Sequence, residues 1–227
     1  MENLNLAVLG TGPVGRAVAG RLAELGHDVT IGTRDPGDTA GREEYAAWAG
    51  EHPGVRLAGF AEAAAAAELV VNAAGGDVAL GILDAAGADN LAGKVLLDIS
   101  NPLDGSKGFP PTLFVKDDDS LAEMIQRAHP DARVVKSLNT MNNALMVDPQ
   151  RLGEDTTVFV SGDDAGAKAI VTDLLRQLGH GDVIDLGGIE TARGPEMWLP
   201  LWIRINLALG GNDFNIRVVR GPSLRQA

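Results

Sequence analysis

The sequence contains no cysteine among its 227 residues, which excludes disulfide bonds and thiolate chemistry. It also lacks an uninterrupted apolar run of the roughly 18 residues that a membrane-spanning helix needs. The most apolar candidate, residues 61–74, is interrupted by Glu62, Glu68 and Asn72. Because no basic segment followed by an apolar stretch opens the chain, we expect no signal peptide and a cytoplasmic location.

Positive charge is scarce as well. The 19 Lys and Arg residues are outnumbered by 31 Asp and Glu residues, and the formal net charge is −12. A chain of this charge repels nucleic acid and anionic membranes, so we expect neither as a partner. A bound phosphate group must instead be held locally, by backbone N–H groups, a helix N-terminus or a nearby Arg. The four His residues are scattered without metal-ligand spacing, so we expect no metal site.

Hydrophobic residues make up 45% of the sequence, and their pattern alternates between short strands and amphipathic helices. We expect strands over residues 4–9, 28–32, 55–59, 69–74, 94–102 with its loop, 132–139, 156–162 and 182–187. Helices are expected over residues 14–25, 41–52, 60–68, 77–87, 120–129 and 164–179. This alternation predicts an α/β fold whose mainly parallel sheet is covered by helices on both faces.

Two regions depart from this alternation. Residues 103–118 are rich in Gly, Pro and Asp, and we expect a long loop there. Residues 190–209 are apolar and helical in pattern; Pro195 suits a helix start, whereas Pro200 predicts a kink or a break. We therefore expect a main domain over residues 1–187 and a short helical extension over 188–227, which covers a substrate, contacts a second copy in a homodimer, or does both.

A glycine-rich turn separates the first expected strand from the first helix and matches the pattern G-x-G-x-x-G. It consists of Gly10, Thr11, Gly12, Pro13, Val14 and Gly15. In such a turn the first glycine permits the tight bend, the second lets a diphosphate approach the backbone, and the third lets helix and strand pack closely. The strand–turn–helix context predicts a dinucleotide at the N-terminus of the helix, in a Rossmann-type doubly wound domain.

The end of the second strand indicates which dinucleotide binds. Ligands lie beyond the carboxyl ends of parallel strands, and the second strand ends near Thr33 and Arg34. Asp28 lies at the opposite edge of the sheet, and Asp35 is too far into the loop to be the favoured ribose acceptor. A hydroxyl and a guanidinium suit a 2′-phosphate, so we predict NADP rather than NAD.

The other strand ends supply the rest of the expected site. Ala73 and Ala74 follow the fourth strand, and their small side chains leave room for a ribose or diphosphate, although close packing of strand and helix is an alternative. Asn101 and Pro102 follow the fifth strand, near the expected nicotinamide. The Asn101 side chain either bonds the ribose or carboxamide or forms a turn before Pro102.

The sixth strand is followed by polar residues, Asn139 among them, and contains Lys136. Lys136 is a candidate general acid for reducing a carbonyl or an imine. The favoured alternative is that its ammonium group pairs with an acid or with backbone carbonyls.

Together, the segments VLGTGPVGRAVAGRLAELGHDVTIGTRDP, VNAAGG, DISNPL and VVKSLNTM resemble the NADP oxidoreductase, coenzyme F420-dependent family over most of residues 4–185. The N-terminal part is also similar to pyrroline-5-carboxylate reductases and to the cytoplasmic domain of membrane ferric reductases. The resemblance implies that residues 11–14 hold the diphosphate and that Thr33 and Arg34 hold the 2′-phosphate. It also implies that Ala73, Asn101 and the Leu138 backbone lie along the rest of NADP.

In that family hydride passes directly between nicotinamide and a stacked deazaflavin ring, which needs positioning rather than a protein acid or nucleophile. We accordingly expect no catalytic side chain, and a deazaflavin or flavin as co-substrate. Two features differ from the family pattern: Asn139 stands where a His is expected, and residues 190–220 are unusually rich in Trp and apolar residues. Reduction of a small carbonyl or imine, and a non-catalytic NADP-binding regulator, remain alternatives.

Overall fold

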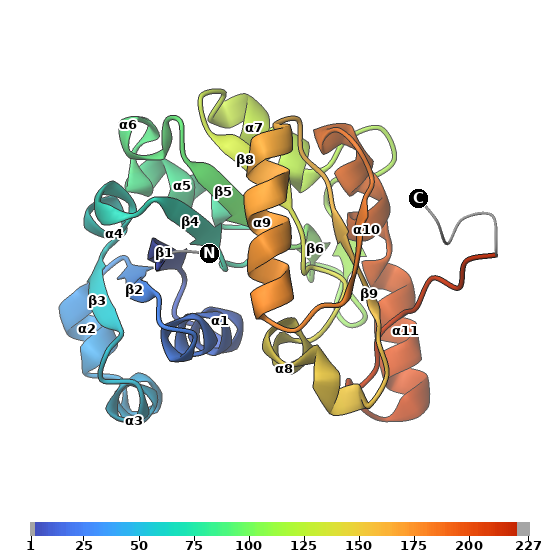
Figure 1. Cartoon of the computed structure of the whole chain (residues 1–227), viewed down its shortest axis with the longest axis horizontal. Helices are drawn as coiled ribbons and strands as arrows, with labels where there is room; N and C mark the ends of the chain where they lie inside the picture. Colours follow the sequence, from blue (N-terminus) through green and yellow to red (C-terminus); the bar gives the residue numbers. More distant parts are fainter. Residues whose placement is uncertain (1–2, 222–227) are drawn as a thin grey trace.

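The structure is a computed structural model, and it describes residues 3–221. Its centre is a six-stranded parallel sheet with the strand order β3-β2-β1-β4-β5-β8 (Figure 1). The strands are β1 (Asn5–Leu9), β2 (Asp28–Thr33), β3 (Arg56–Gly59), β4 (Leu69–Asn72), β5 (Val95–Asp98) and β8 (Arg133–Lys136). The order reverses between β1 and β4, which opens a crevice at the carboxyl ends of these strands.

Helices cover both faces of the sheet, and each face has its own apolar core. The chain forms α1 (Pro13–Glu24), α2 (Pro36–Ala40), α3 (Glu43–Glu51), α4 (Phe60–Ala66), α5 (Ala79–Ala86), α6 (Ala88–Leu91), α7 (Leu121–Ala128), α8 (Asn143–Val147), η1 (Pro149–Leu152) and α9 (Ala165–Gln177). On one face α1, α8 and α9 pack on the sheet, and on the other face α4, α5 and α7 do so. This arrangement confirms the predicted doubly wound Rossmann-type fold.

Two small sheets extend the main one. The strands β9 (Thr157–Val160) and β10 (Asp182–Asp185) pair in parallel, and an antiparallel bridge between Lys136 and Ser161 joins them to the end of β8. The strands β6 (Leu103–Asp104) and β7 (Thr112–Leu113) form a short antiparallel pair. They lie within the region expected to be a loop, and their two-residue length explains why no alternating pattern revealed them.

The chain ends in η2 (Ile189–Ala192), α10 (Arg193–Met197) and α11 (Leu199–Leu209). Pro200 lies in the first turn of α11, where its missing N–H is not needed, so the predicted break is confirmed. After α11 the chain returns along β9, and the N–H of Thr157 donates to the carbonyl of Ile216 at 2.9 Å. Within residues 3–221 no helix is both long and apolar enough to cross a membrane.

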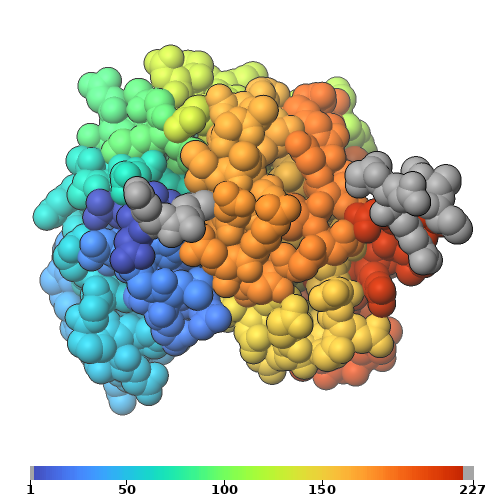
Figure 2. All heavy atoms as spheres, in the orientation of Figure 1, coloured from blue at the N-terminus to red at the C-terminus, as the bar shows by residue number. Residues whose placement is uncertain are grey.

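The α9 helix and its neighbours cover the middle of the face seen in Figure 2, between the N-terminal half of the sheet and the C-terminal segment. Its buried side chains are Ala167, Val171, Leu174 and Leu175. They share one core cluster with buried residues of β1, α1 and α8. Through this core α9 fixes the position of α8, which lines part of the crevice.

Candidate functional site

The glycine turn between β1 and α1 has the geometry that its sequence predicts. Gly10 has φ +129°, a conformation that side chains rarely adopt, and a Cβ there would lie 2.8 Å from the carbonyl oxygen of Ala73. A Cβ on Gly15 would overlap the carbonyl oxygen of Gly10. A Cβ on Gly12, by contrast, would meet no atom within 4 Å. The open space at Gly12 is therefore room for a ligand rather than for packing.

The N-terminus of α1 faces this open space. Pro13 occupies the first turn, and no side chain caps the helix. The free N–H groups and the helix dipole favour an anion at such a terminus. Arg16 lies one turn further along, but its guanidinium pairs with Glu44.

A cavity of about 450 Å³ lies above the turn and reaches the end of β2. It is lined by Gly10, Thr11, Gly12, Gly32, Thr33, Arg34, Asp35, Asp38, Thr39, Arg42, Phe60, Ala73, Ala74, Gly75, Val78 and Ile82. Three clusters of the predicted site residues, the glycine turn, Thr33 with Arg34, and Ala73 with Ala74, thus meet at one cavity. Its neutral floor at the turn and its guanidinium groups at the end of β2 suit a diphosphate and a further phosphate group.

The Arg34 guanidinium is exposed, and within residues 3–221 it has no ion-pair or hydrogen-bond partner. The Thr33 hydroxyl is buried and lies 2.8 Å from the Thr39 hydroxyl. Because one mutual hydrogen bond uses only one of the two protons, the pair keeps a second proton for a ligand. Arg42 also lines the cavity, but it pairs with Asp38, one helical turn away.

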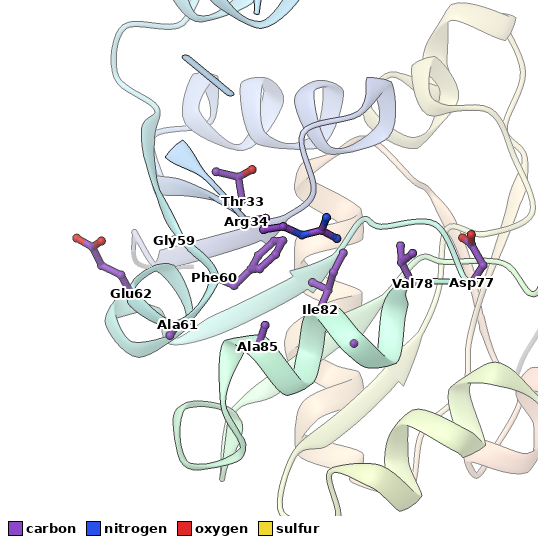
Figure 3. Close-up of a pocket in the computed structure, with 11 residues that line it drawn as sticks. Thr33, Arg34, Gly59, Phe60, Ala61, Glu62, Asp77, Val78, Ile82 and Ala85 are labelled. Carbon is purple, nitrogen blue, oxygen red and sulfur yellow. The ribbon is translucent and has the colours of Figure 1, made fainter. Parts of the chain in front are cut away.

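A second, wider cavity of about 690 Å³ continues from Arg34 between α4 and α5 (Figure 3). The Arg34 side chain extends across it above Phe60 and Ile82, and Val78 lies at the same wall. A guanidinium over apolar side chains is suited to stack on a flat aromatic base. This cavity is the expected place for adenine.

A third cavity, of about 370 Å³, lies at the other end of the crevice. It is lined by Val14, Ala73, Ala74, Gly75, Gly76, Asp77, Ile99, Ser100, Asn101, Leu103, Met141, Asn142, Asn143 and Met146. Four predicted site residues are found here, Val14, Ala73, Ala74 and Asn101, beside the apolar side chains of α8 and its preceding loop. The sequence did not predict α8, because a five-residue helix is too short to show a period.

Asn139 connects this end of the crevice to the C-terminal segment. Its amide nitrogen donates to Asn101 Oδ1 at 3.0 Å and to the Pro195 carbonyl at 3.0 Å. Asn101 in turn donates to the Asn139 carbonyl at 3.1 Å. Both predicted asparagines therefore hold loops together, and Asn139 is only 2% exposed.

Five predicted site residues line none of the three cavities: Pro13, Gly15, Pro102, Leu138 and Asn139. Pro102 is buried and accepts a hydrogen bond from the N–H of Phe114 at 2.9 Å, which fixes the start of the β6–β7 pair. Leu138 is buried with φ +61°, so it forms a left-handed turn after β8. They shape the wall behind the third cavity.

Lys136 is buried, and its ammonium group has three acceptors. Nζ lies 2.7 Å from Asp98 Oδ2, 2.6 Å from the Ser100 carbonyl and 2.8 Å from Glu196 Oε1. Burial lowers the pKa of Lys136, but the charges of Asp98 and Glu196 outweigh burial and raise that pKa above its usual value. A fully paired ammonium without exposed surface contradicts the alternative in which Lys136 donates a proton to a substrate.

The described residues contain no group of three or more side chains that could hold a metal ion. The site instead combines a glycine turn, an unpaired arginine and an open cavity at the switch point of a parallel sheet. These features define a dinucleotide-binding protein of the Rossmann class.

The protein-family model described as NADP oxidoreductase, coenzyme F420-dependent, matches residues 5–102 of this chain. The crystal structure of a protein from Arthrobacter sp. FB24, for which an F420-dependent NADP reductase activity is suggested, is 60% identical; the match covers 96% of this chain and 100% of that one, with a TM-score of 0.95. This chain belongs to the F420-dependent NADP oxidoreductase family, a family of oxidoreductases.

Two curated proteins are also similar to this chain. The F420-dependent NADP reductase of Methanocaldococcus jannaschii is 32% identical over 131 residues, which is 57% of this chain and 58% of that protein. The metalloreductase STEAP3 of Rattus norvegicus is 30% identical over 215 residues, which is 92% of this chain but 40% of that protein. The matches therefore span less than two thirds of either relative.

Proposed function

We propose that this protein transfers hydride between NADP(H) and a planar redox coenzyme, either a deazaflavin of the F420 type or a flavin. The observation that carries the proposal is the third cavity, where the wall offers apolar side chains, amides, the Ser100 hydroxyl and a single carboxylate, Asp77. Neither the hydroxyl nor the carboxylate is set up as a nucleophile with an adjacent base, because the Ser100 hydroxyl donates to the buried Asp98 at 2.7 Å, and Asp77 is exposed and has no hydrogen-bond partner within residues 3–221. Bound NADPH supplies the hydride, so the protein needs to hold two flat rings together and to exclude water.

The chain's own residues divide this work along the crevice. The turn at Gly12 and the N-terminus of α1 hold the diphosphate, and Arg34 with the Thr33–Thr39 hydroxyl pair holds the 2′-phosphate. Met141 and Met146 give the nicotinamide end a flexible apolar wall against which a flat ring can pack. The names of the similar reductases support the deazaflavin as the second ring.

The test is anaerobic oxidation of NADPH, with the deazaflavin, FMN, FAD, ferric chelates, imines and ketones each offered as acceptor. We expect turnover with the deazaflavin or a flavin, seen as loss of the acceptor's visible absorbance together with loss of NADPH. Turnover with an imine or ketone alone would overturn the proposal. Tight NADPH binding without turnover on any acceptor would favour the regulator instead.

Gly12→Val is the matched control for this test. Its side chain enters the open space in which the diphosphate is placed, while its Cβ meets no protein atom within 4 Å. We therefore expect an unchanged far-ultraviolet spectrum and loss of NADPH binding. Retained turnover in this variant would show that the reaction occurs elsewhere on the chain.

We further propose that the chain forms a homodimer through α11. This helix exposes three leucines, Leu201, Leu207 and Leu209, by 52%, 50% and 66%. A second copy would cover this apolar surface. Light scattering should give twice the chain mass of 23.6 kDa, and Leu201→Glu should reduce it to one chain. A wild-type mass of one chain would disprove the dimer.

The cytoplasmic location of the protein stays a prediction.

A further inference from the structure

Asp77 is the one charged residue among those that line the third cavity. It is exposed, and within residues 3–221 its carboxylate has no ion-pair or hydrogen-bond partner. It also lines the wider cavity beside Arg34, so it stands where the two ends of the crevice meet. An unpaired carboxylate at this position interacts electrostatically with the charge of a ring that binds in the third cavity.

The loop that carries Asp77 is held in place. A Cβ on Gly76 would overlap the carbonyl oxygen of Asn101, so this glycine packs directly on the loop after β5. The N–H of Val78 closes a turn onto the carbonyl of Gly75 at 3.1 Å. Asp77 Oδ1 lies 2.8 Å from where a Cβ on Gly75 would stand, and Gly75 lines both the diphosphate cavity and the third cavity.

We propose that Asp77 makes the site discriminate between the two redox states of the coenzyme, favouring NADP⁺ over NADPH. The inference rests on the proposed function, because it places nicotinamide in the third cavity. The oxidised ring carries a positive charge and the reduced ring is neutral, whereas the phosphates are the same in both forms. Repulsion between Asp77 and the phosphates therefore cancels in the ratio of the two dissociation constants, and attraction to the oxidised ring does not.

The Asp77 carboxylate thereby also shifts the reduction potential of the bound NADP⁺/NADPH couple. Tighter binding of NADP⁺ than of NADPH makes the bound couple a stronger reductant than the free one. The enzyme would thereby favour hydride transfer from NADPH to the second coenzyme. Asp77 acts here as a specificity-determining residue, and it donates no proton and forms no bond.

The experiment measures the dissociation constants of NADP⁺ and NADPH by calorimetry for the wild type and for Asp77→Asn. We expect the ratio Kd(NADP⁺)/Kd(NADPH) to rise about twofold to threefold in Asp77→Asn, the size of one exposed charge pair at roughly 6–8 Å in water. Asp77→Glu should keep the wild-type ratio. Raising the salt concentration should move the wild-type ratio toward that of Asp77→Asn, because exposed charges are screened.

Glu62→Gln is the matched control. Glu62 lines the wider cavity but not the third one, so its loss should leave the ratio unchanged. An unchanged ratio in Asp77→Asn, or an equal weakening of both ligands, would overturn the inference while leaving the NADP site intact. Failure of the wild type to bind either form would overturn the proposed function and the inference together.

Discussion

At the scale of single residues, the site depends most on Arg34, because the net charge of −12 opposes any phosphorylated ligand. Its guanidinium has no partner within residues 3–221, so it reaches a ligand without breaking a protein contact. We predict that Arg34→Ala weakens NADPH binding by about 1.5–3 kcal/mol, the range for a charge-assisted hydrogen bond. NADH lacks the 2′-phosphate but keeps the adenine on which the guanidinium can stack, so its binding should weaken much less than that of NADPH.

Parallel titrations of the wild type and Arg34→Ala with NADPH and NADH check this prediction. Arg42→Ala serves as the control, since Arg42 lines the same cavity but is already paired with Asp38. Its effect should be smaller than that of Arg34→Ala. Equal losses for NADPH and NADH would show that the guanidinium does not contact the 2′-phosphate.

Lys136 presents the opposite case, a cation whose partners are all inside the protein. Replacing it with Met would leave the Asp98 and Glu196 carboxylates buried without their shared cation. Removal of one partner from a buried ion pair costs about 3–5 kcal/mol, so Lys136→Met should lower the free energy of unfolding by that amount. Urea unfolding followed by circular dichroism measures the loss.

Lys168→Met is the comparison for that measurement. Lys168 pairs with Asp185, whose side chain is 54% exposed, and exposed pairs contribute about 0–1 kcal/mol. Similar losses for the two variants would contradict the view that Lys136 is a structural cation. Motif spacing alone could not decide this role, because the partner Glu196 lies 60 residues away in sequence and on another element.

The sequence predicts correctly the positions of those residues whose placement follows from local geometry. Gly10, Gly12 and Gly15 are specified by one turn, and Arg34 by the end of one strand. The residues it missed, such as Asn142 and Asn143 at the start of α8, lie in a segment without a period. Their positions depend on packing between distant segments, which no short stretch of sequence records.

At the scale of elements, α7 and α10 are joined by two carboxylates that work differently. Glu196 on α10 accepts the backbone N–H groups of Leu121 and Ala122 at 2.8 and 3.1 Å, which caps the start of α7 from another element. Glu123 on α7 accepts Nε of Arg193 at 2.9 Å, so α7 also holds α10. The C-terminal segment is thus fixed to the sheet through the first turn of α7.

The second of these contacts predicts a pH dependence. The hydrogen bond from Arg193 lowers the pKa of Glu123 below its ordinary value of 4.5, although burial acts against it. Since the folded pKa is the lower one, the contact contributes its full stability above about pH 4.5 and loses it as the pH falls through the folded pKa. Glu123→Gln should therefore destabilise the protein at neutral pH, and the difference should shrink in acid.

Urea midpoints of the wild type and Glu123→Gln between pH 7 and pH 3 provide the measurement. Glu51→Gln is the control, because Glu51 is exposed at the end of α3. The Glu51 carboxylate has no ion-pair or hydrogen-bond partner within residues 3–221, so we expect Glu51→Gln and the wild type to have similar urea midpoints at neutral pH. A difference between Glu123→Gln and the wild type that grew in acid would contradict the lowered pKa.

At the scale of the whole molecule, the fold class follows from the sequence because a strand–helix alternation leaves few arrangements other than a parallel sheet covered on both faces. The relation between residues 1–187 and 188–227 does not follow in that way. Ile189 and Ala192 belong to the core cluster that contains Leu121 and Ile125. These contacts place residues of the C-terminal segment in the same hydrophobic core as α7, although the change in composition near residue 187 divides the two segments in the sequence.

These contacts predict that residues 1–187 do not fold stably without residues 188–227. Removing the segment uncovers the apolar surface of α7 and takes Glu196 from Lys136, and it deprives the N–H of Thr157 of the Ile216 carbonyl. Uncovering one large apolar side chain costs about 1.5–3 kcal/mol, and breaking the buried pair about 3–5 kcal/mol. Their sum is comparable to the whole stability of a typical domain, about 5–15 kcal/mol. Thermal unfolding should show one cooperative transition for the full chain and none for residues 1–187. A truncated chain that melted cooperatively within a few degrees of the full chain, and still bound NADPH, would instead make residues 188–227 a dispensable extension.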